Sequence, residues 1–292
     1  MEPSASYYDL SSRLRSMQIK KTIAQVTLAV AVIVLVFGVV SGYVLIVFPM
    51  MFLLICASIY LSFLKKKLKR DFAAPMMRQA LSEVFTRVEY DPLHFLPADF
   101  LELSAMEFPF DIDRVEGSDY IHAEYKGLDL KLSDIRLIDR RNSGKNSRNV
   151  TVFEGLWMVC DFHKEITCDL LLQEKSGFSI RFIDRLRLNH ALIETENAAF
   201  NDKFLISASI EHDAFYLLTP QMMERILQMD SRGGGVSYMR FTRAGKVHIA
   251  INSGKNFFEL TNSWDPDRIM ANFQNEIRYI TDLIDILRLA EM

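Results

Sequence analysis

Residues 22–64 read TIAQVTLAVAVIVLVFGVVSGYVLIVFPMMFLLICASIYLSFL, an apolar stretch of 43 residues that is interrupted only at Ser41-Gly42. As one helix it would be about 65 Å long at ~1.5 Å per residue. A bilayer core is only about 30 Å thick and takes ~20 residues per pass. Two passes joined by a tight turn fit this length, so the sequence predicts a transmembrane helical hairpin with spans at 22–40 and 43–64.

Basic residues flank both predicted spans, and none lies in the loop between them. They are Arg13, Arg15, Lys20 and Lys21 before the first span, and Lys65, Lys66, Lys67, Lys69 and Arg70 after the second. Because basic residues near span ends are retained on the cytoplasmic side, we expect a multi-pass protein of the cell membrane with both termini cytoplasmic. The alternative is a re-entrant second segment bent at Pro49.

The predicted spans contain no Asp, Glu, Lys, Arg or His. Ionisable groups inside a membrane mark ion and proton pathways, so the hairpin is interpreted as an anchor rather than as part of a transporter or channel. Gly38-x-x-x-Gly42 has a spacing that lets membrane helices approach closely. It falls across the turn, however, and is interpreted as a permissive corner.

Two regions of opposite charge share the totals of 34 basic and 37 acidic residues. Residues 1–70 contain nine of the basic and two of the acidic residues, a formal charge of +7, which leaves −10 for residues 71–292. The basic part can meet anionic lipid headgroups. The acidic part lacks the basic footprint of a nucleic-acid-binding protein, so we expect no nucleic-acid partner.

The sequence predicts an α+β protein in which the hairpin precedes a cytoplasmic domain with a mainly antiparallel sheet and flanking helices. Its parts are a basic segment at 1–21, the hairpin at 22–64, a juxtamembrane segment and amphipathic helix at 65–88, the α+β domain at 89–262 and a C-terminal amphipathic helix at 263–292. The amphipathic helix within residues 65–88 is predicted from apolar residues that recur every four positions from Phe72 to Val88.

Turn and cap signals divide the soluble part. Lys126-Gly127 separates two alternating runs and predicts a β-hairpin, and residues 140–148 are polar and predict an exposed loop. Strands are predicted at 120–125, 128–132, 135–138, 150–162, 166–172, 178–183, 204–210, 236–241, 247–251 and 257–260. Thr219-Pro220 and Asp265-Pro266 each predict a helix start, and the apolar stripe of the last helix is interpreted as core, with a partner-binding or self-associating face as the alternative.

Cys160, His163 and Cys168 form a cluster of metal-type ligands. If residues 163–165 are a hairpin turn, the two cysteines face each other across neighbouring strands, as a zinc or redox pair would. Zinc sites usually take four ligands, and buried small hydrophobes explain both thiols. We therefore expect no metal and no cofactor, and free thiols in a reducing cytosol.

Other candidate residues also have simpler explanations. Arg232-Gly233-Gly234-Gly235 could form a phosphate nest, but it leads into a strand and not a helix, which favours a flexible connection. His94, His122, His190, His212 and His248 lack a partner at metal-binding spacing. Possible carboxylate pairs are Asp161, Glu165 and Asp169, and Glu194 with Glu196; solvated sheet edges and loops account for them. We assign none of these residues a catalytic role.

Several phrases resemble the DUF3137 family of bacterial membrane proteins of unknown function. They are residues 104–108 (SAMEF), 116–121 (EGSDYI), 152–157 (VFEGLW) leading to 161–164 (DFHK), 200–204, and 214–225 (AFYLLTPQMMER). The resemblance covers about residues 75–260 and implies a bacterial inner-membrane protein with a cytoplasmic domain. It supplies no catalytic residues. At Ala123 and His163 the chain departs from the Gly or Asn that relatives tend to have.

The sequence favours a binding or scaffolding module held at the cytoplasmic face of the membrane, with the bilayer and a protein partner or a second copy as its contacts. One alternative is a membrane-tethered enzyme with a site drawn from Asp161, His163 and Thr219. Another is an accessory subunit of a membrane complex that uses the hairpin for packing.

Overall fold

The computed structural model describes residues 5–41, 44–103, 105–143, 146–161, 166–176, 191–258 and 265–289. The chain forms two compact units. The helical unit comprises Met1–Gln79 and Leu260–Phe273, and the sheet unit comprises Ala80–Glu259 and Gln274–Met292.

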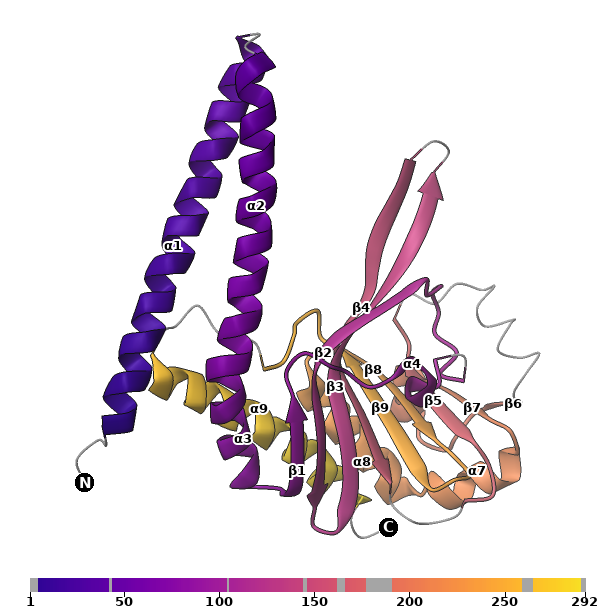
Figure 1. Ribbon diagram of the computed structural model, residues 1–292. Coiled ribbons are helices and arrows are strands. Elements are labelled where there is room, and N and C mark those ends of the chain that lie inside the picture. The colour runs from indigo at the N-terminus through magenta and orange to yellow at the C-terminus, as the bar shows by residue number, and fades with distance from the viewer. Residues whose placement is uncertain are drawn as a thin grey trace. The chain divides into compact units, whose positions relative to one another are not determined.

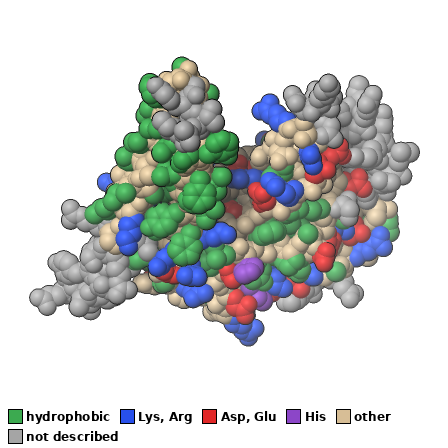
Figure 2. Space-filling model, turned by 45° about the horizontal axis from the view of Figure 1, so that its top comes forward, with side chains coloured by type: hydrophobic (Ala, Val, Ile, Leu, Met, Phe, Trp, Pro, Cys, Tyr) green, Lys and Arg blue, Asp and Glu red, His purple; other side chains and the backbone are tan. Residues whose placement is uncertain are grey.

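The helical unit is built on α1 (Ala5–Val40) and α2 (Val44–Leu68), which lie side by side (Figure 1). By length and composition both helices can cross a membrane. Large apolar side chains cover their surface (Figure 2), and Ile33 and Phe52 are 67% and 70% exposed. Because soluble monomers rarely expose so large a contiguous apolar surface, this unit is compatible with membrane association.

Small residues of α1 form its seam with α2. Ala24, Ala31 and Gly38 recur every seven positions and are buried, whereas most of their neighbours are exposed. Small side chains let two helix backbones approach closely. Gly38, the first glycine of the predicted corner motif, therefore packs in this seam together with Ala24 and Ala31. Gly42, the second glycine, lies outside the described residues.

The helix does not stop at the end of α2. It continues through the π-helical η1 (Lys69–Ala73) into α3 (Ala74–Ser82). The predicted helix up to Val88 is wrong beyond Ser82, because β1 (Thr86–Asp91) follows and pairs with the next strand. Apolar spacing is a local signal, and the ladder to a distant strand outweighs it here.

Within the described residues of the sheet unit, nine strands form one sheet with antiparallel pairing throughout, in the order β1-β2-β3-β4-β9-β8-β5-β7-β6. The further strands are β2 (Arg114–Tyr125), β3 (Leu128–Ser143), β4 (Asn146–Asp161), β5 (Leu170–Glu174), β6 (Ala191–Ile193), β7 (Phe204–Ala208), β8 (Val236–Phe241) and β9 (Lys246–Asn252). The predicted hairpin is confirmed: Lys126 and Gly127 have φ of 53° and 84°, as a tight two-residue turn requires.

Two predictions about the strands are wrong. Residues 140–148 are not a loop, since β3 and β4 continue as a ladder up to Ser143 and Asn146. Phe257 and Phe258 lie in a bend and not in a strand. The predicted strand at 178–183 lies outside the described residues. Four elements were not predicted from the sequence: β1, β6, α6 (Ala198–Lys203) and α7 (Glu211–Leu217).

The sheet packs on both faces. The segment around α4 (Ala98–Leu101) covers one face, where Phe108 contacts Trp157 and Tyr238 edge-on with ring centroids 5.6 and 4.9 Å apart. On the other face lie α8 (Pro220–Gly233) and the end of α9 (Pro266–Leu287) from Gln274 onward (Figure 1). Apolar side chains are therefore buried on both faces of the sheet.

The two predicted helix starts are confirmed. The Thr219 hydroxyl accepts the backbone N–H of Met222 at 3.2 Å and caps α8. Asp265 Oδ1 accepts the N–H of Asp267 at 3.2 Å before α9. The apolar stripe of α9 is core, as predicted, because its members in the sheet unit are at most 1% exposed: Ile277, Ile280, Ile284 and Leu287.

Candidate functional site

The hairpin of β3 and β4 extends beyond its neighbours as a two-stranded ribbon. On one side β2 pairs with β3 only as far as Ile138, and on the other β9 pairs with β4 only from Gly155. We call residues 139–143 and 146–151 the arm; it projects from the sheet in Figure 1. Its exposed side chains include Arg140, Arg141, Ser147, Arg148, Asn149 and Thr151. The arm is thus a polar element that contributes little to the core.

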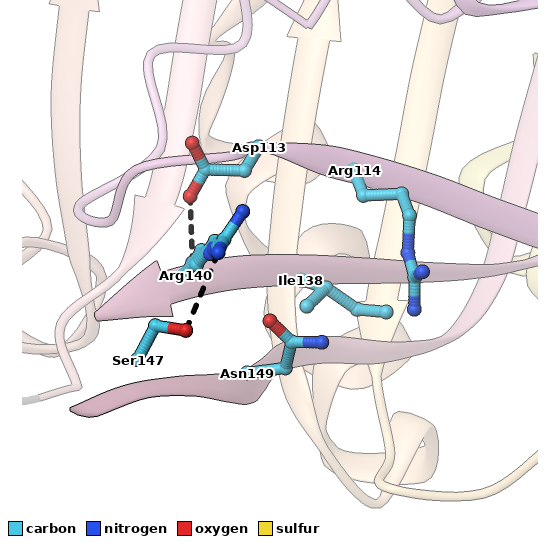
Figure 3. Close-up of a pocket in the computed structure, with 6 residues that line it drawn as sticks. All are labelled: Asp113, Arg114, Ile138, Arg140, Ser147 and Asn149. Atoms are coloured by element: carbon cyan, nitrogen blue, oxygen red, sulfur yellow. Dashed lines mark hydrogen bonds between the residues drawn. The ribbon is translucent and has the colours of Figure 1, made fainter. Parts of the chain in front are cut away.

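A pocket of about 360 Å³ lies at the base of the arm (Figure 3). Its lining residues come from the start of β2, from β3 and from β4: Asp113, Arg114, Ile138, Arg140, Ser147 and Asn149. The Asp113 carboxylate accepts the backbone N–H of Arg140 at 2.6 Å, and the Asp113 N–H donates to the Ile138 carbonyl at 2.9 Å. These bonds fix the residues before β2 against the base of the arm.

The arginines at this pocket differ in their partners. Arg114 Nη2 lies 2.7 Å from Glu116. The Arg140 guanidinium instead donates to the neutral hydroxyl of Ser147 at 3.3 Å, and no carboxylate of the described residues pairs with it. Guanidinium, hydroxyl and amide groups together are donors for an oxyanion such as phosphate. The pocket can therefore bind an anion, and its side chains include no nucleophile paired with a base.

A second polar group lies partly buried beside α4. Arg240 of β8 forms an ion pair with Glu102, which follows α4, and its Nη2 lies 3.7 Å from Asp169 Oδ1. His248 of β9 is the register partner of Arg240, and its Nε2 is 4.0 Å from Glu102 Oε1. These residues tie α4 to the centre of the sheet.

His248 is 1% exposed, and neither ring nitrogen has a hydrogen-bond partner within the described part of the chain. Burial lowers the pKa of the His248 imidazole to about 4; the charges of Arg240 and Lys246 act in the same direction and Glu102 acts against them. The ring is thus neutral near pH 7. The role that these contacts support is structural: the neutral His248 ring packs in the core, and the ion pair of Arg240 with Glu102 lies above it.

The structure does not pair the strands of the two cysteines, as a zinc or redox pair across a hairpin would require. Cys160 lies in β4, opposite Leu130 of β3 and Val247 of β9, and Cys168 precedes β5, which pairs with β7 and β8. Two strands therefore separate β4 from β5 in the sheet. Both thiols are free and buried, and burial raises the pKa of each. His163 and Glu165 lie outside the described residues, among which no cluster of three metal-type ligands occurs.

The remaining histidines and carboxylates are dispersed. His94 Nδ1 lies 2.8 Å from Asp91, His122 Nε2 lies 2.7 Å from Asp129, and the His212 ring meets the Tyr216 ring edge-on. Asp169 Oδ1 accepts the N–H of Arg243 at 3.1 Å, Asp161 ends β4, and Glu194 and Glu196 are exposed beside α6. His190 lies outside the described residues.

The glycine run and Thr219 have structural roles. Gly234 ends α8 in the left-handed conformation at φ 63°, and Gly235 leads into β8, so this segment connects a helix to a strand as predicted. Arg232 Nη1 lies 3.3 Å from Asp282 of α9. The Thr219 hydroxyl is engaged as a helix cap, so the structure gives no support to its proposed place in an active site.

Neither of the two polar groups, the pocket at the arm and the ion pair above His248, was predicted from the sequence. The arm was interpreted as a loop because its side chains are polar on both faces, and polarity alone does not separate a ribbon from a loop. A signal for the second group was present: Arg240 stands between Met239 and Phe241, and His248 stands between Val247 and Ile249. Charged and titratable side chains are rarely placed among buried apolar residues unless they have a partner.

A family model described as "Protein of unknown function (DUF3137)" matches residues 151–289. This match supports the resemblance to the DUF3137 family that the sequence indicated. The crystal structure of the mycobacterial trehalose monomycolate transport factor A, TtfA, is similar at 11% sequence identity and a TM-score of 0.35, covering 74% of this chain and 95% of that chain. Likeness at this level does not establish a common fold. No curated protein matches the chain.

Proposed function

We propose that this protein is a binding module anchored in the bacterial inner membrane by α1 and α2, with both termini and the sheet unit on the cytoplasmic side. The observation that carries the proposal is the apolar surface of the two helices, whose exposed side chains would be costly in water and favourable in lipid. Basic residues follow the second apolar run, at Lys66, Lys67, Lys69 and Arg70, as expected for a cytoplasmic flank.

The sheet unit supports a role in binding. It joins α2 through a helix that runs on to Ser82, so whatever binds the sheet unit is held near the bilayer. The arm exposes polar side chains on both of its strands. A protein partner or a second copy of the chain is the proposed contact of this module.

Membrane extraction of the full chain tests the anchor. The double variant Ile33→Asp, Phe52→Asp places two carboxylates on exposed apolar positions, each of which costs about 3 kcal/mol at the centre of a membrane helix. We expect the unaltered chain to resist alkaline extraction and the variant to be released or degraded. Ile210→Asp, at an exposed apolar position of the sheet unit, is the matched control. Equal extraction of all three proteins would contradict the anchor.

Two further measurements test orientation and binding. A reporter fused after Met292 should be active only in the cytoplasm. Crosslinking in intact cells, followed by mass spectrometry of the full chain, should recover a partner or a contact between copies that involves residues of the sheet unit. Recovery of neither would count against a binding module while leaving the anchor in place.

A further inference from the structure

We propose that the pocket at the base of the arm binds the phosphate of an anionic lipid headgroup, so that the arm holds the sheet unit against the bilayer in which α1 and α2 are anchored. This inference rests on the proposed function, because it needs the two helices in a membrane. The relevant donors are the Arg140 guanidinium, the Ser147 hydroxyl and the Asn149 amide (Figure 3).

The pocket offers one cation whose donors are not taken by a carboxylate. Arg140 has five N–H donors in a rigid fork that suits phosphate, and the structure gives that guanidinium a single partner in its described surroundings, the Ser147 hydroxyl. Asp113 also lines the pocket, but its Oδ2 already accepts the backbone N–H of Arg140 at 2.6 Å. The cavity, at about 360 Å³, is large enough for a phosphate ester.

The charge of the arm contrasts with that of the unit that bears it. Three arginines, Arg140, Arg141 and Arg148, stand against one carboxylate, Asp139, in the described residues of the arm, whereas residues 71–292 as a whole have a formal charge of −10. Figure 2 shows blue side chains on the projecting ribbon. An anionic surface attracts the arm and repels the acidic remainder, so charge alone would turn the arm toward lipid.

The stability of the arm also points to a contact outside the sheet. A two-stranded ribbon is at best marginally stable in water when neither face packs on a core. Exposed positions occur on both strands, at Arg140 and Arg141 of β3 and at Ser147 to Asn149 of β4. Contact with a binding surface supplies the interactions that the chain itself does not.

The chain connection allows the contact. Only 21 residues separate Leu64, the end of the apolar run, from Thr86, the start of β1. As a helix this connection spans about 30 Å. The sheet unit is therefore held close to the membrane, and lipid is the anion source present at the highest local concentration.

The test uses the full chain with Cys56→Ala in lipid vesicles. Cys160 and Cys168 are buried, so a fluorophore on Thr151→Cys reports on the arm, and its quenching by a nitroxide on the lipid headgroup measures contact with the surface. We expect stronger quenching in vesicles that contain phosphatidylglycerol than in phosphatidylcholine alone. Raising the salt from about 0.05 to about 0.5 M should weaken it, because the Debye length shrinks.

Variants separate the pocket from general charge. Each basic residue at an anionic surface contributes about a fivefold factor, so Arg140→Gln with Arg148→Gln should lower the ratio of bound to free arm by about 25-fold. Lys255→Gln with Arg278→Gln removes the same charge from exposed positions elsewhere and should change it little. Ser147→Ala leaves the charge intact and should still weaken quenching severalfold in phosphatidylglycerol vesicles.

The outcomes are distinct. An arm label that stays unquenched although the chain floats with the vesicles would overturn this inference and leave the anchor standing; a chain that fails to float would overturn both. If Ser147→Ala has no effect, or the control pair weakens quenching as much as the arginine pair, the pocket is not the site. Binding of soluble glycerol phosphate as tight as that of the bilayer would overturn the assignment to lipid.

Discussion

Acidification should destabilise the sheet unit through His248, which is 1% exposed and lacks hydrogen-bond partners among the described residues. Its folded pKa is about 4, against an ordinary value of 6.5. Between these values the unfolded chain binds a proton that the folded chain does not. The contribution of the neutral His248 ring to the free energy of unfolding is therefore fully present above about pH 6.5, and it is lost as the pH falls toward about 4.

The magnitude follows from the two pKa values. The full difference corresponds to about 3 kcal/mol, and about 2 kcal/mol of it is lost between pH 8 and pH 5. His248→Leu removes the titrating ring from a site where it makes no hydrogen bond, so at pH 8 we expect the variant to be within about 1 kcal/mol of the unaltered chain. At pH 5 the variant should be the more stable protein.

Urea unfolding of the full chain in detergent micelles measures this difference. The sequence has two tryptophans, and Trp264→Phe in all proteins leaves the buried Trp157 as the fluorescent probe of the sheet. His212→Leu controls for the loss of an imidazole from an exposed position. If the unaltered chain and His248→Leu lose stability in parallel between pH 8 and pH 5, the assignment of a buried neutral ring is wrong.

Three further predictions concern the fold and are measured by the same unfolding assay. Gly155→Ala places a Cβ against the backbone carbonyl of Ile251 in β9 and should cost at least about 2 kcal/mol, more than any exposed substitution; a neutral effect would contradict the close approach of β4 and β9. Thr219→Ala removes the cap of α8 and should cost about 1 kcal/mol, whereas Thr219→Ser should restore it. Phe108→Ala should cost about 3–5 kcal/mol because the ring packs on Trp157, and a loss below 1 kcal/mol would show that this segment is not part of the core.

Signals that depend on neighbouring residues were reliable in the sequence. Lys126-Gly127 predicted its hairpin because positive φ at two successive residues suits few residue types. Thr219-Pro220 and Asp265-Pro266 predicted helix starts because a cap needs only a side-chain oxygen and a residue with a preset φ. The buried stripe of α9 follows from helical periodicity in the same way.

The order of the strands could not be read in this way. Cys160 and Cys168 are close in sequence, and a hairpin turn at residues 163–165 would have paired their strands. The structure pairs β4 with β9 instead, a partner some ninety residues later in the chain. Each strand can pair with several other strands, and packing of the whole sheet decides which pairing is the most stable. A local sequence pattern does not carry that information.

By itself the sequence determined the two apolar helices, the basic residues beside them, the antiparallel α+β class and the caps, since each depends on residues within a turn or two of one another. Only the tertiary structure decided that residues 140–148 form a ribbon, that Arg114, Arg140 and Ser147 share a pocket, and that Arg240 meets Glu102 over His248. These groups come from segments distant in sequence, and packing of the whole sheet brings them together.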